Sequence, residues 1–361
     1  MRYKKASVLL FVMAMIFASS VILMSIAEYA SIALRSRATA SKEYDLRLDA
    51  YSALNATAAI LNEYAEIDGG IYSVLQGWEK PFADGRISLP SGSQADVVVV
   101  DESGKIPLRN TSSSKLAKYL EALGLSETDS LKYSDLINDW IDSNDNADIR
   151  GAEYLDYDHN SALPPNRPME SFRELAFVKD AKDIFFDENG EPTELYRKFT
   201  SVFSLEPFKN INLNSASEEV LNTLMESEDK DYTQNLYLAL RGKIGAVDND
   251  ILWCKNSADL RNRGVSEYPT QNAAFKAQFL KIFITIKRGL AQYNLVAYYT
   301  DATTYASMRK TSTNTSSRSS KSSSTSSASK QSFENGAINA TASKKANKSG
   351  FKVVKIREFS R

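Results

Sequence analysis

The sequence predicts an α+β fold in which a long N-terminal helix and an antiparallel sheet accompany a large inserted α-helical domain. Three observations lead to this prediction. An uncharged apolar run at residues 7–27 continues without a break into a helical stripe. Strand-like segments lie near 83–110 and return only near 282–299 and 351–359. Between them the apolar residues recur at helical spacing.

The apolar run at 7–27 is long enough to cross a membrane. Its 21 residues form a helix about 31 Å long, close to the thickness of the hydrocarbon core. The basic residues Arg2, Lys4 and Lys5 precede it and favour a cytoplasmic N-terminus. We therefore expect a single-pass anchor that carries an extracytoplasmic body.

Two alternatives remain for this segment. Ser25-Ile26-Ala27 has the small-x-small pattern of a secretory cleavage site, which would make Glu28 the mature N-terminus. The run is longer than a typical signal core, and neither Pro nor Gly interrupts the chain before Gly69. The second alternative is an ordinary single-span anchor that carries an unrelated domain.

Residues 28–68 continue the helix as an amphipathic segment. Apolar residues recur there at steps of three and four, at Tyr29, Ile32, Ala33, Ala40, Tyr44, Leu48, Tyr51, Leu54, Ala58, Leu61 and Ala65. One helix from Ser7 to about Glu66 would be roughly 90 Å long. Gly69-Gly70 is expected to end it.

The β signals fall in three places. In the first part, 69–110, the β-branched run Val97–Val100, the turn-forming Asp101–Gly104 and Lys105-Ile106 together predict a hairpin. The second part, 275–303, predicts two strands separated by Gly289. A terminal strand at 351–361 needs a partner, and 294–300 is the nearest candidate.

The region 111–274 is expected to form the inserted helical domain. Helical spacing occurs over 115–125, 134–141, 171–178, 216–225 and 273–283. The tract 304–350 is rich in Ser, Thr and Lys and is predicted to be disordered. It carries eight Lys or Arg and one Glu between Arg309 and Gly350.

Composition argues against catalysis. The chain has one histidine, His159, and one cysteine, Cys254, so it can form neither an internal disulfide nor the common zinc sites. No phosphate-binding loop, HExxH or GxSxG motif is present. A membrane-tethered hydrolase would therefore lack a nucleophile–base pair.

An acidic segment predicts a calcium site. Residues 127–190 hold sixteen Asp or Glu and six Lys or Arg. From Asp142 the spacing follows the calcium-loop pattern of an EF-hand, although Ala147 replaces the usual glycine. We expect a structural Ca²⁺ site that is not a true EF-hand. Its expected ligands are Asp142, Asn144, Asn146, Asp148, Glu153 and Asp156. Asp139 and Asp158 are available to complete it. The alternative is a solvated acidic loop.

The segment 211–225, INLNSASEEVLNTLM, is similar to the opening of a helix-hairpin-helix module. This similarity suggests an alternative function, in which the chain is a membrane-anchored protein that binds or takes up DNA. The sequence continues as MESEDKD, with no glycine hairpin and with acidic residues that would repel phosphate. We therefore expect no nucleic-acid partner.

Several motifs in order resemble a known family, the minor pseudopilin K of the type II (general) secretion pathway. They are VVVVDESGKI (97–106), LINDWIDSNDNADIRGAEYLDYD (136–158), PPNRPMESFRELAFVKD (164–180) and FKNINLNSASEEVLNTL (208–224). The resemblance implies a type IV pilin-like fold. It also implies a non-enzymatic subunit that initiates or caps the tip of the pseudopilus and aids export of folded proteins across the outer membrane. The implied location is the inner membrane, with the bulk of the chain in the periplasm.

The resemblance also assigns residues. A prepilin peptidase would remove the leader 1–6 by cutting between Ala6 and Ser7 and would methylate Ser7. Major pseudopilins carry a glutamate where this chain has Phe11. A buried glutamate needs a partner such as the neighbouring subunit's ammonium, so Phe11 suits the tip position. Other minor pseudopilins, of the I and J types, are the expected partners of Ile32, Tyr44, Leu48 and Tyr51.

Overall fold

The computed structural model describes residues 3–83, 89, 91–158, 162–225, 230–245, 251–270, 272–301 and 351–360. The tract 304–350 and His159 lie outside these residues, so the predicted disorder of the tract stays a prediction.

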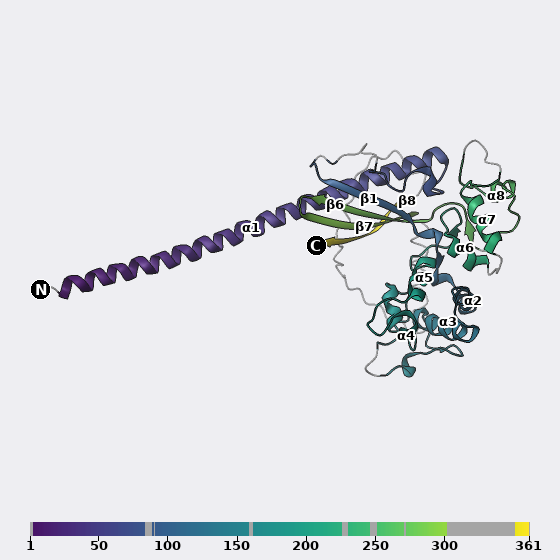
Figure 1. The fold of residues 1–361 in the computed structure, drawn as a ribbon, viewed down its shortest axis with the longest axis horizontal. Coiled ribbons are helices and arrows are strands. Elements are labelled where there is room, and N and C mark those ends of the chain that lie inside the picture. Colours follow the sequence, from purple (N-terminus) through teal and green to yellow (C-terminus); the bar gives the residue numbers. More distant parts are fainter. Residues whose placement is uncertain are drawn as a thin grey trace, which may run out of the picture.

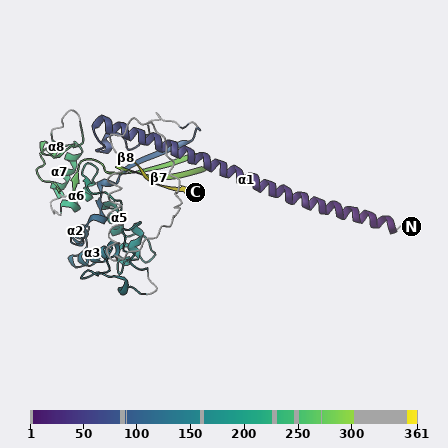
Figure 2. The ribbon, with the colours of Figure 1, turned by 180° about the vertical axis from the view of Figure 1, so that it is seen from behind.

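One helix, α1 (Tyr3–Asp68), runs through the apolar run and the amphipathic segment without a break, as the sequence predicts. Gly69 follows it with φ 78°, a left-handed conformation that suits glycine and ends the helix. The N-terminal half extends far beyond the rest of the fold (Figures 1 and 2). Its stretch Leu9–Arg35 is exposed and is long and apolar enough to cross a membrane.

The C-terminal half of α1 packs on one face of a four-stranded antiparallel sheet. The strands are β1 (Gln94–Asp101), β6 (Phe279–Arg288), β7 (Ala291–Asp301) and β8 (Phe351–Ser360), in the order β1-β6-β7-β8. Inward-facing Val97, Val99, Ile282, Ile284 and Leu295 join Leu46, Ala50, Ala53 and Leu61 of α1 in one core. The predicted α+β class is confirmed.

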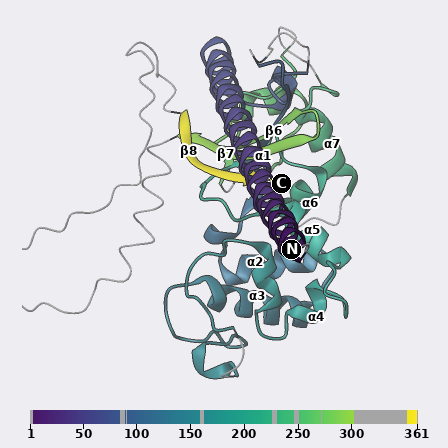
Figure 3. The same ribbon diagram turned by 90° about the vertical axis from the view of Figure 1, so that its left-hand side faces the viewer.

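The two predicted strands on either side of Gly289 and the predicted pairing of the terminal strand are confirmed. β6 and β7 form a hairpin around Gly289, whose φ is 61°. β8 then pairs with β7, with an irregularity at Tyr298/Tyr299. The terminal strand therefore closes one edge of the sheet (Figure 3).

Two predicted elements are wrong. Val97–Val100 and Lys105-Ile106 do not form a hairpin, because β1 pairs with β6 and β2 (Ile106–Pro107) pairs in parallel with β3 (Phe203–Ser204). The turn residues instead form the short 3-10 helix Glu102–Gly104, which leads the chain into the inserted domain. The segment 273–283 is not helical, since it contains β5 (Ala273–Ala274) and the start of β6. Leu280, Ile282, Ile284 and Ile286 alternate, and the sheet buries them on one face.

The inserted region is helical and has its own core. Its helices are α2 (Ser113–Ala122), α3 (Glu127–Ile141), α4 (Lys182–Phe185), α5 (Glu194–Val202), α6 (Glu218–Met225), α7 (Lys230–Leu240) and α8 (Ser257–Asn262). A further short strand, β4 (Ile211–Asn212), pairs with β5. Segment 171–178 contains a 3-10 helix, Phe172–Ala176. Trp140, Phe185, Phe199 and Phe203 lie in this second core.

Buried polar residues join the two cores. The Asn212 side-chain amide donates to Asp101 Oδ2 at 2.7 Å and to the Tyr72 carbonyl at 2.8 Å. Asp101 also accepts from the Ser103 amide at 2.9 Å. These bonds fix Asn212, in the inserted region, against the end of β1 and the segment that follows α1.

Candidate functional site

The helix α1 presents two different faces along its C-terminal half. Leu46, Ala50, Ala53 and Leu61 face the sheet and are buried. Tyr44 and Leu48 lie on the other side, where they are 65% and 57% exposed, and Ile32 is also exposed. The structure therefore leaves these three predicted contacts available to another protein.

Tyr51, the fourth predicted contact, is half-buried and has an internal partner. Its hydroxyl donates to Glu358 Oε1 of β8 at 2.6 Å. The sequence stripe did not separate the two faces, because apolar residues occur on both. The small residues Ala50 and Ala53 are the signal that was missed, since they allow the sheet to approach closely.

Ala6, Ser7 and Phe11 lie in the first turns of α1. Phe11 is exposed within the apolar stretch. The side chains of Ala6 and Ser7 are outside the part of the chain that the structure describes.

Within the acidic segment, the predicted calcium loop begins at Asp142, where α3 ends, and folds as a series of tight turns held by side-chain-to-backbone hydrogen bonds. Asp142 Oδ1 accepts from the Asn144 amide at 3.1 Å, and Asn144 Oδ1 accepts from the Asn146 amide at 2.9 Å. Asp148 donates its backbone amide to both oxygens of Asp139, at 3.2 and 3.1 Å. The loop therefore folds back, and Asp148 contacts Asp139 near the C-terminal end of α3.

Glu153 is the most unusual member of this segment. It is only 5% exposed, and neither of its carboxylate oxygens has a hydrogen-bond partner in the described structure. The Asp156 carboxylate accepts a hydrogen bond from the Glu153 backbone amide at 3.0 Å and therefore lies close to Glu153. An unpartnered buried carboxylate is costly unless a proton or a cation compensates it.

The electrostatics of the segment agree with this geometry. Burial, together with the neighbouring carboxylates of Asp139, Asp142, Asp145 and Asp156, raises the pKa of Glu153 to about 7. Burial, with a smaller effect of the nearby carboxylates of Asp148 and Asp142, raises the pKa of Asp139 to about 6, although hydrogen bonds from the backbone amides of Asp148 and Ala152 oppose the rise. Among the residues that the structure describes, neither carboxylate forms an ion pair.

These residues fit a calcium ion in part. Carboxylate and amide oxygens are the ligands that Ca²⁺ prefers, and a bound cation would compensate the buried carboxylate of Glu153, which has no hydrogen-bond partner in the described structure. Asp142, Asn144 and Asp156 use side-chain oxygens in local hydrogen bonds. Among the described residues, no three acidic, histidine or cysteine side chains already form a metal-binding group. A bound ion would therefore require the loop to exchange some of these local bonds for metal contacts.

Two residues of the acidic segment were missed by the sequence reasoning. Gly151 packs so closely on the Asp139 carboxylate that a Cβ atom would collide with it. Asn166 has φ 46°, and its side-chain amide donates to Asp145 Oδ1 at 2.7 Å and to the Asn144 carbonyl at 3.1 Å. Its Oδ1 atom is buried and has no partner in the described structure. Predicted Asp158 is exposed at the end of the segment.

The segment that is similar to a helix-hairpin-helix opening uses its polar groups internally. The Asn214 side chain donates to the carbonyls of Cys254 and Phe275 at 2.7 and 2.8 Å, and it accepts from the Cys254 amide at 2.9 Å. Ser217 Oγ accepts from the Val220 amide at 3.2 Å at the start of α6. Cys254 is fully buried, and burial raises the pKa of its thiol to about 11.

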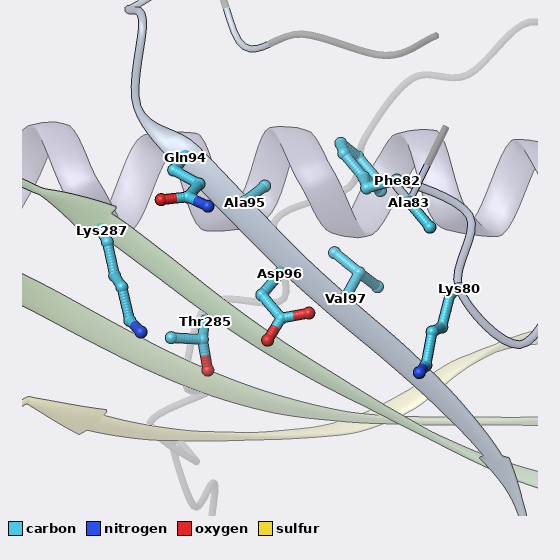
Figure 4. Close-up of a pocket in the computed structure, with 9 residues that line it drawn as sticks. All are labelled: Lys80, Phe82, Ala83, Gln94, Ala95, Asp96, Val97, Thr285 and Lys287. Atoms are coloured by element: carbon cyan, nitrogen blue, oxygen red, sulfur yellow. The ribbon is translucent and has the colours of Figure 1, made fainter. Parts of the chain in front are cut away.

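A shallow cavity of about 270 Å³ lies beside β1. Figure 4 shows Lys80, Asp96, Thr285 and Lys287 around it, on the side of the sheet away from α1. Its lining mixes two lysines with one carboxylate.

Comparisons with known proteins agree with the motifs. Residues 98–185 match the family model described as type II secretion system (T2SS), protein K. A chain in the crystal structure of the GspK–GspI–GspJ complex from the enterotoxigenic Escherichia coli type 2 secretion system has a similar fold, with a TM-score of 0.50 and 15% identity. The match covers 74% of this chain and 94% of that chain. A comparison with curated protein sequences gave no match.

Proposed function

We propose that this chain is a non-enzymatic pseudopilin subunit, and the resemblance to minor pseudopilin K, the family-model match over residues 98–185 and the similar fold support this proposal. It would initiate or cap the tip of the type II secretion pseudopilus and so aid the export of folded proteins across the outer membrane. It would reside in the inner membrane with a single span, and its body would lie in the periplasm.

The observation that carries this proposal is the unbroken helix α1. Its first half is apolar and exposed, and its second half is fixed on the sheet. A helix of this kind can be held in a bilayer and later pack against similar helices in a filament. Exposed Tyr44 and Leu48 would contact the I- and J-type minor pseudopilins. These types are named in the solved complex, which supports them as partners.

The tip position is supported by Phe11 and by the inserted domain. A subunit without a glutamate at this position has no buried charge that requires a neighbour's ammonium in the bilayer. Helices α6, α7 and α8 lie beyond the end of the sheet that is opposite to the N-terminus of α1, and α2 to α5 lie to one side of that end (Figure 1). Their bulk would hinder addition of another subunit at that end.

We also propose that a structural Ca²⁺ ion binds the acidic segment. Glu153 and Asp139 would neutralise it, with further oxygens from Asp142, Asn144, Asn146, Asp148 and Asp156. The ion would replace the missing positive charge beside Glu153 and hold the loop in one conformation.

N-terminal sequencing and intact-mass measurement of the mature protein from membranes test the pseudopilin assignment. Processing by a prepilin peptidase is expected to give a methylated N-terminal Ser7 and a retained α1. A mature chain that begins at Glu28 would show a cleaved secretory signal and overturn the assignment.

A second experiment tests the helix contacts. Tyr44→Ala combined with Leu48→Asp is expected to reduce association of the full-length chain with I- and J-type pseudopilins. Asn55→Ala, an exposed position on the same helix, is the matched control and should associate normally. Equal association of both variants would contradict a role for this face.

A further inference from the structure

The described chain passes between the sheet and the inserted region at two neighbouring places. It leaves the sheet after Asp101 of β1 and returns to it at Phe279 of β6. Because Asp101 is paired with Leu280 in the sheet, both crossings lie side by side at the same end of the sheet. Domains joined in this way move against each other unless a large apolar interface holds them. The orientation of the inserted region therefore depends on side-chain contacts at this junction.

The junction contacts on the α1 side of the sheet are fully buried. Strand alternation places Asp101 on the same face as Val97 and Val99, which lie in the core beneath α1. Asn212 is 0% exposed there and donates both to Asp101 and to the Tyr72 carbonyl. Breaking these bonds would leave buried polar groups without partners, which is costly. This side of the junction is therefore the more firmly closed one.

A short segment of the inserted region crosses the opposite face of the sheet. Residues 205–209, called the strap here, connect β3 to β4. Phe208 of the strap is 1% exposed and packs against Phe279 and Tyr298. Phe279 alternates with Leu280 of the core, so it lies on the face that points away from α1. The strap thus seats one aromatic ring on that outer face.

A group of charges lies beside the seated ring. Glu206 Oε1 of the strap is 3.1 Å from Lys281 Nζ, and the same ammonium is 3.3 Å from Glu102 Oε1. The side chains of Lys281 and Glu206 are 20% and 18% exposed. Lys281 therefore separates two carboxylates that would repel each other without it. Water reaches this group, so it opens more readily than the buried bonds of Asn212.

The strap is also bonded to the inserted region itself. The side-chain amide of Asn110, which precedes α2, donates to the Phe208 carbonyl at 2.8 Å. On the sheet side, Gln278 Oε1 accepts from the amides of Lys209 and Asn210 at 3.4 and 3.2 Å. The strap is therefore expected to move together with the inserted region when its contacts with the sheet break.

We propose that the strap is releasable and sets the angle between the inserted region and the sheet. When Phe208 leaves Phe279 and Tyr298, the inserted region turns about the buried contacts of Asn212. A packed aromatic ring is either seated or displaced, so the junction has two positions and not a continuous range. The tip subunit that we propose would present its inserted region at the angle that the strap sets.

The test measures the distance between two spin labels by pulsed electron paramagnetic resonance of the full-length chain in detergent. The labels are placed at Thr128→Cys of α3 and Leu290→Cys of the β6–β7 turn, both exposed positions. Cys254 is fully buried, and intact mass verifies that two labels are attached. Because the measurement uses this chain alone, its outcome leaves the pseudopilin assignment untouched.

Two substitutions release the strap, and each has a matched control. Phe208→Ala removes the seated ring, and its control is Phe177→Ala, at a 55% exposed phenylalanine of the inserted region. Lys281→Gln leaves Glu102 and Glu206 facing each other. Its controls are Lys287→Gln, at an exposed lysine of the same strand, and Lys281→Arg, which keeps the positive charge.

The wild-type chain is expected to give one narrow distance distribution. Phe208→Ala and Lys281→Gln should widen it at least twofold or add a second maximum, and the three controls should leave it unchanged. A wild-type distribution in the strap variants would overturn the inference, and so would equal widening in the controls. Near-UV circular dichroism verifies that each variant is folded. If Phe208→Ala does not fold, Lys281→Gln decides the outcome.

Discussion

The Tyr51 hydroxyl of α1 donates to Glu358 Oε1 of β8 at 2.6 Å, which ties the last strand of the chain to its first helix. Arg47 lies one turn earlier and donates to the same oxygen through Nε at 3.1 Å. The neighbouring strand β7 pairs with β8 in an antiparallel ladder. The C-terminal strand is therefore fixed both by its ladder and by these side chains.

Removing the Tyr51 hydroxyl should loosen β8. Tyr51→Phe is expected to lower the free energy of unfolding by about 1 kcal/mol, the usual worth of one hydrogen bond. Limited proteolysis of the full chain in detergent should release the C-terminal segment faster. Tyr44→Phe, whose ring is exposed, is the control. Unchanged proteolysis of the Tyr51 variant would show that the strand ladder alone holds β8.

The acidic segment should make the stability of the calcium-free protein fall as pH rises from about 4.5 to 7.5. The folded-state pKa values of Asp139 and Glu153, about 6 and about 7, lie above the ordinary values of these groups. In this range the native protein holds more protons than the unfolded chain, so stability decreases with pH. The expected loss is on the order of a few kcal/mol. Thermal unfolding in a chelator, across this pH range, measures it.

Calcium should reverse this loss at neutral pH, because binding requires the ionised carboxylates. Glu153→Gln is expected to flatten the pH dependence in chelator and to weaken the calcium-induced rise in melting temperature. Glu194→Gln, at an exposed glutamate of α5, should change neither. A melting temperature at pH 7.5 that calcium does not raise would contradict the site.

A methyl group at Gly151 should disturb the same segment. Gly151→Ala places a Cβ atom against the Asp139 carboxylate, so the loop must move. We expect a destabilisation of about 1–3 kcal/mol, as for other overpacked sites, and weaker calcium binding measured by calorimetry. Gly70→Ala is the control, since its Cβ atom would meet only the flexible Lys276 side chain.

Local patterns allowed much of the fold to be predicted. Helical spacing gave α1 and α3, and the residues around Gly289 gave the β6–β7 hairpin. The partner of β1 could not be predicted in this way, because Val98 pairs with Phe283, far along the chain. For the acidic segment, spacing indicated Glu153 as a candidate ligand, but it indicated neither the burial of Glu153 nor the close packing of Gly151 against Asp139. Properties that arise from such tertiary contacts leave no periodic signal.

The junction between the sheet and the inserted domain should depend on Asn212. Asn212→Ala removes the amide that reaches both Asp101 and the Tyr72 carbonyl, and it leaves a buried carboxylate with fewer donors. Burial already raises the pKa of Asp101, and hydrogen bonds from Ser103, Ser215 and Asn212 oppose that rise. We expect a loss of about 2–4 kcal/mol, measured by denaturant unfolding of the full chain. Asn55→Ala, at an exposed position on α1, should lose less than about 0.5 kcal/mol. Equal effects of the two substitutions would mean that the apolar cores alone position the inserted domain.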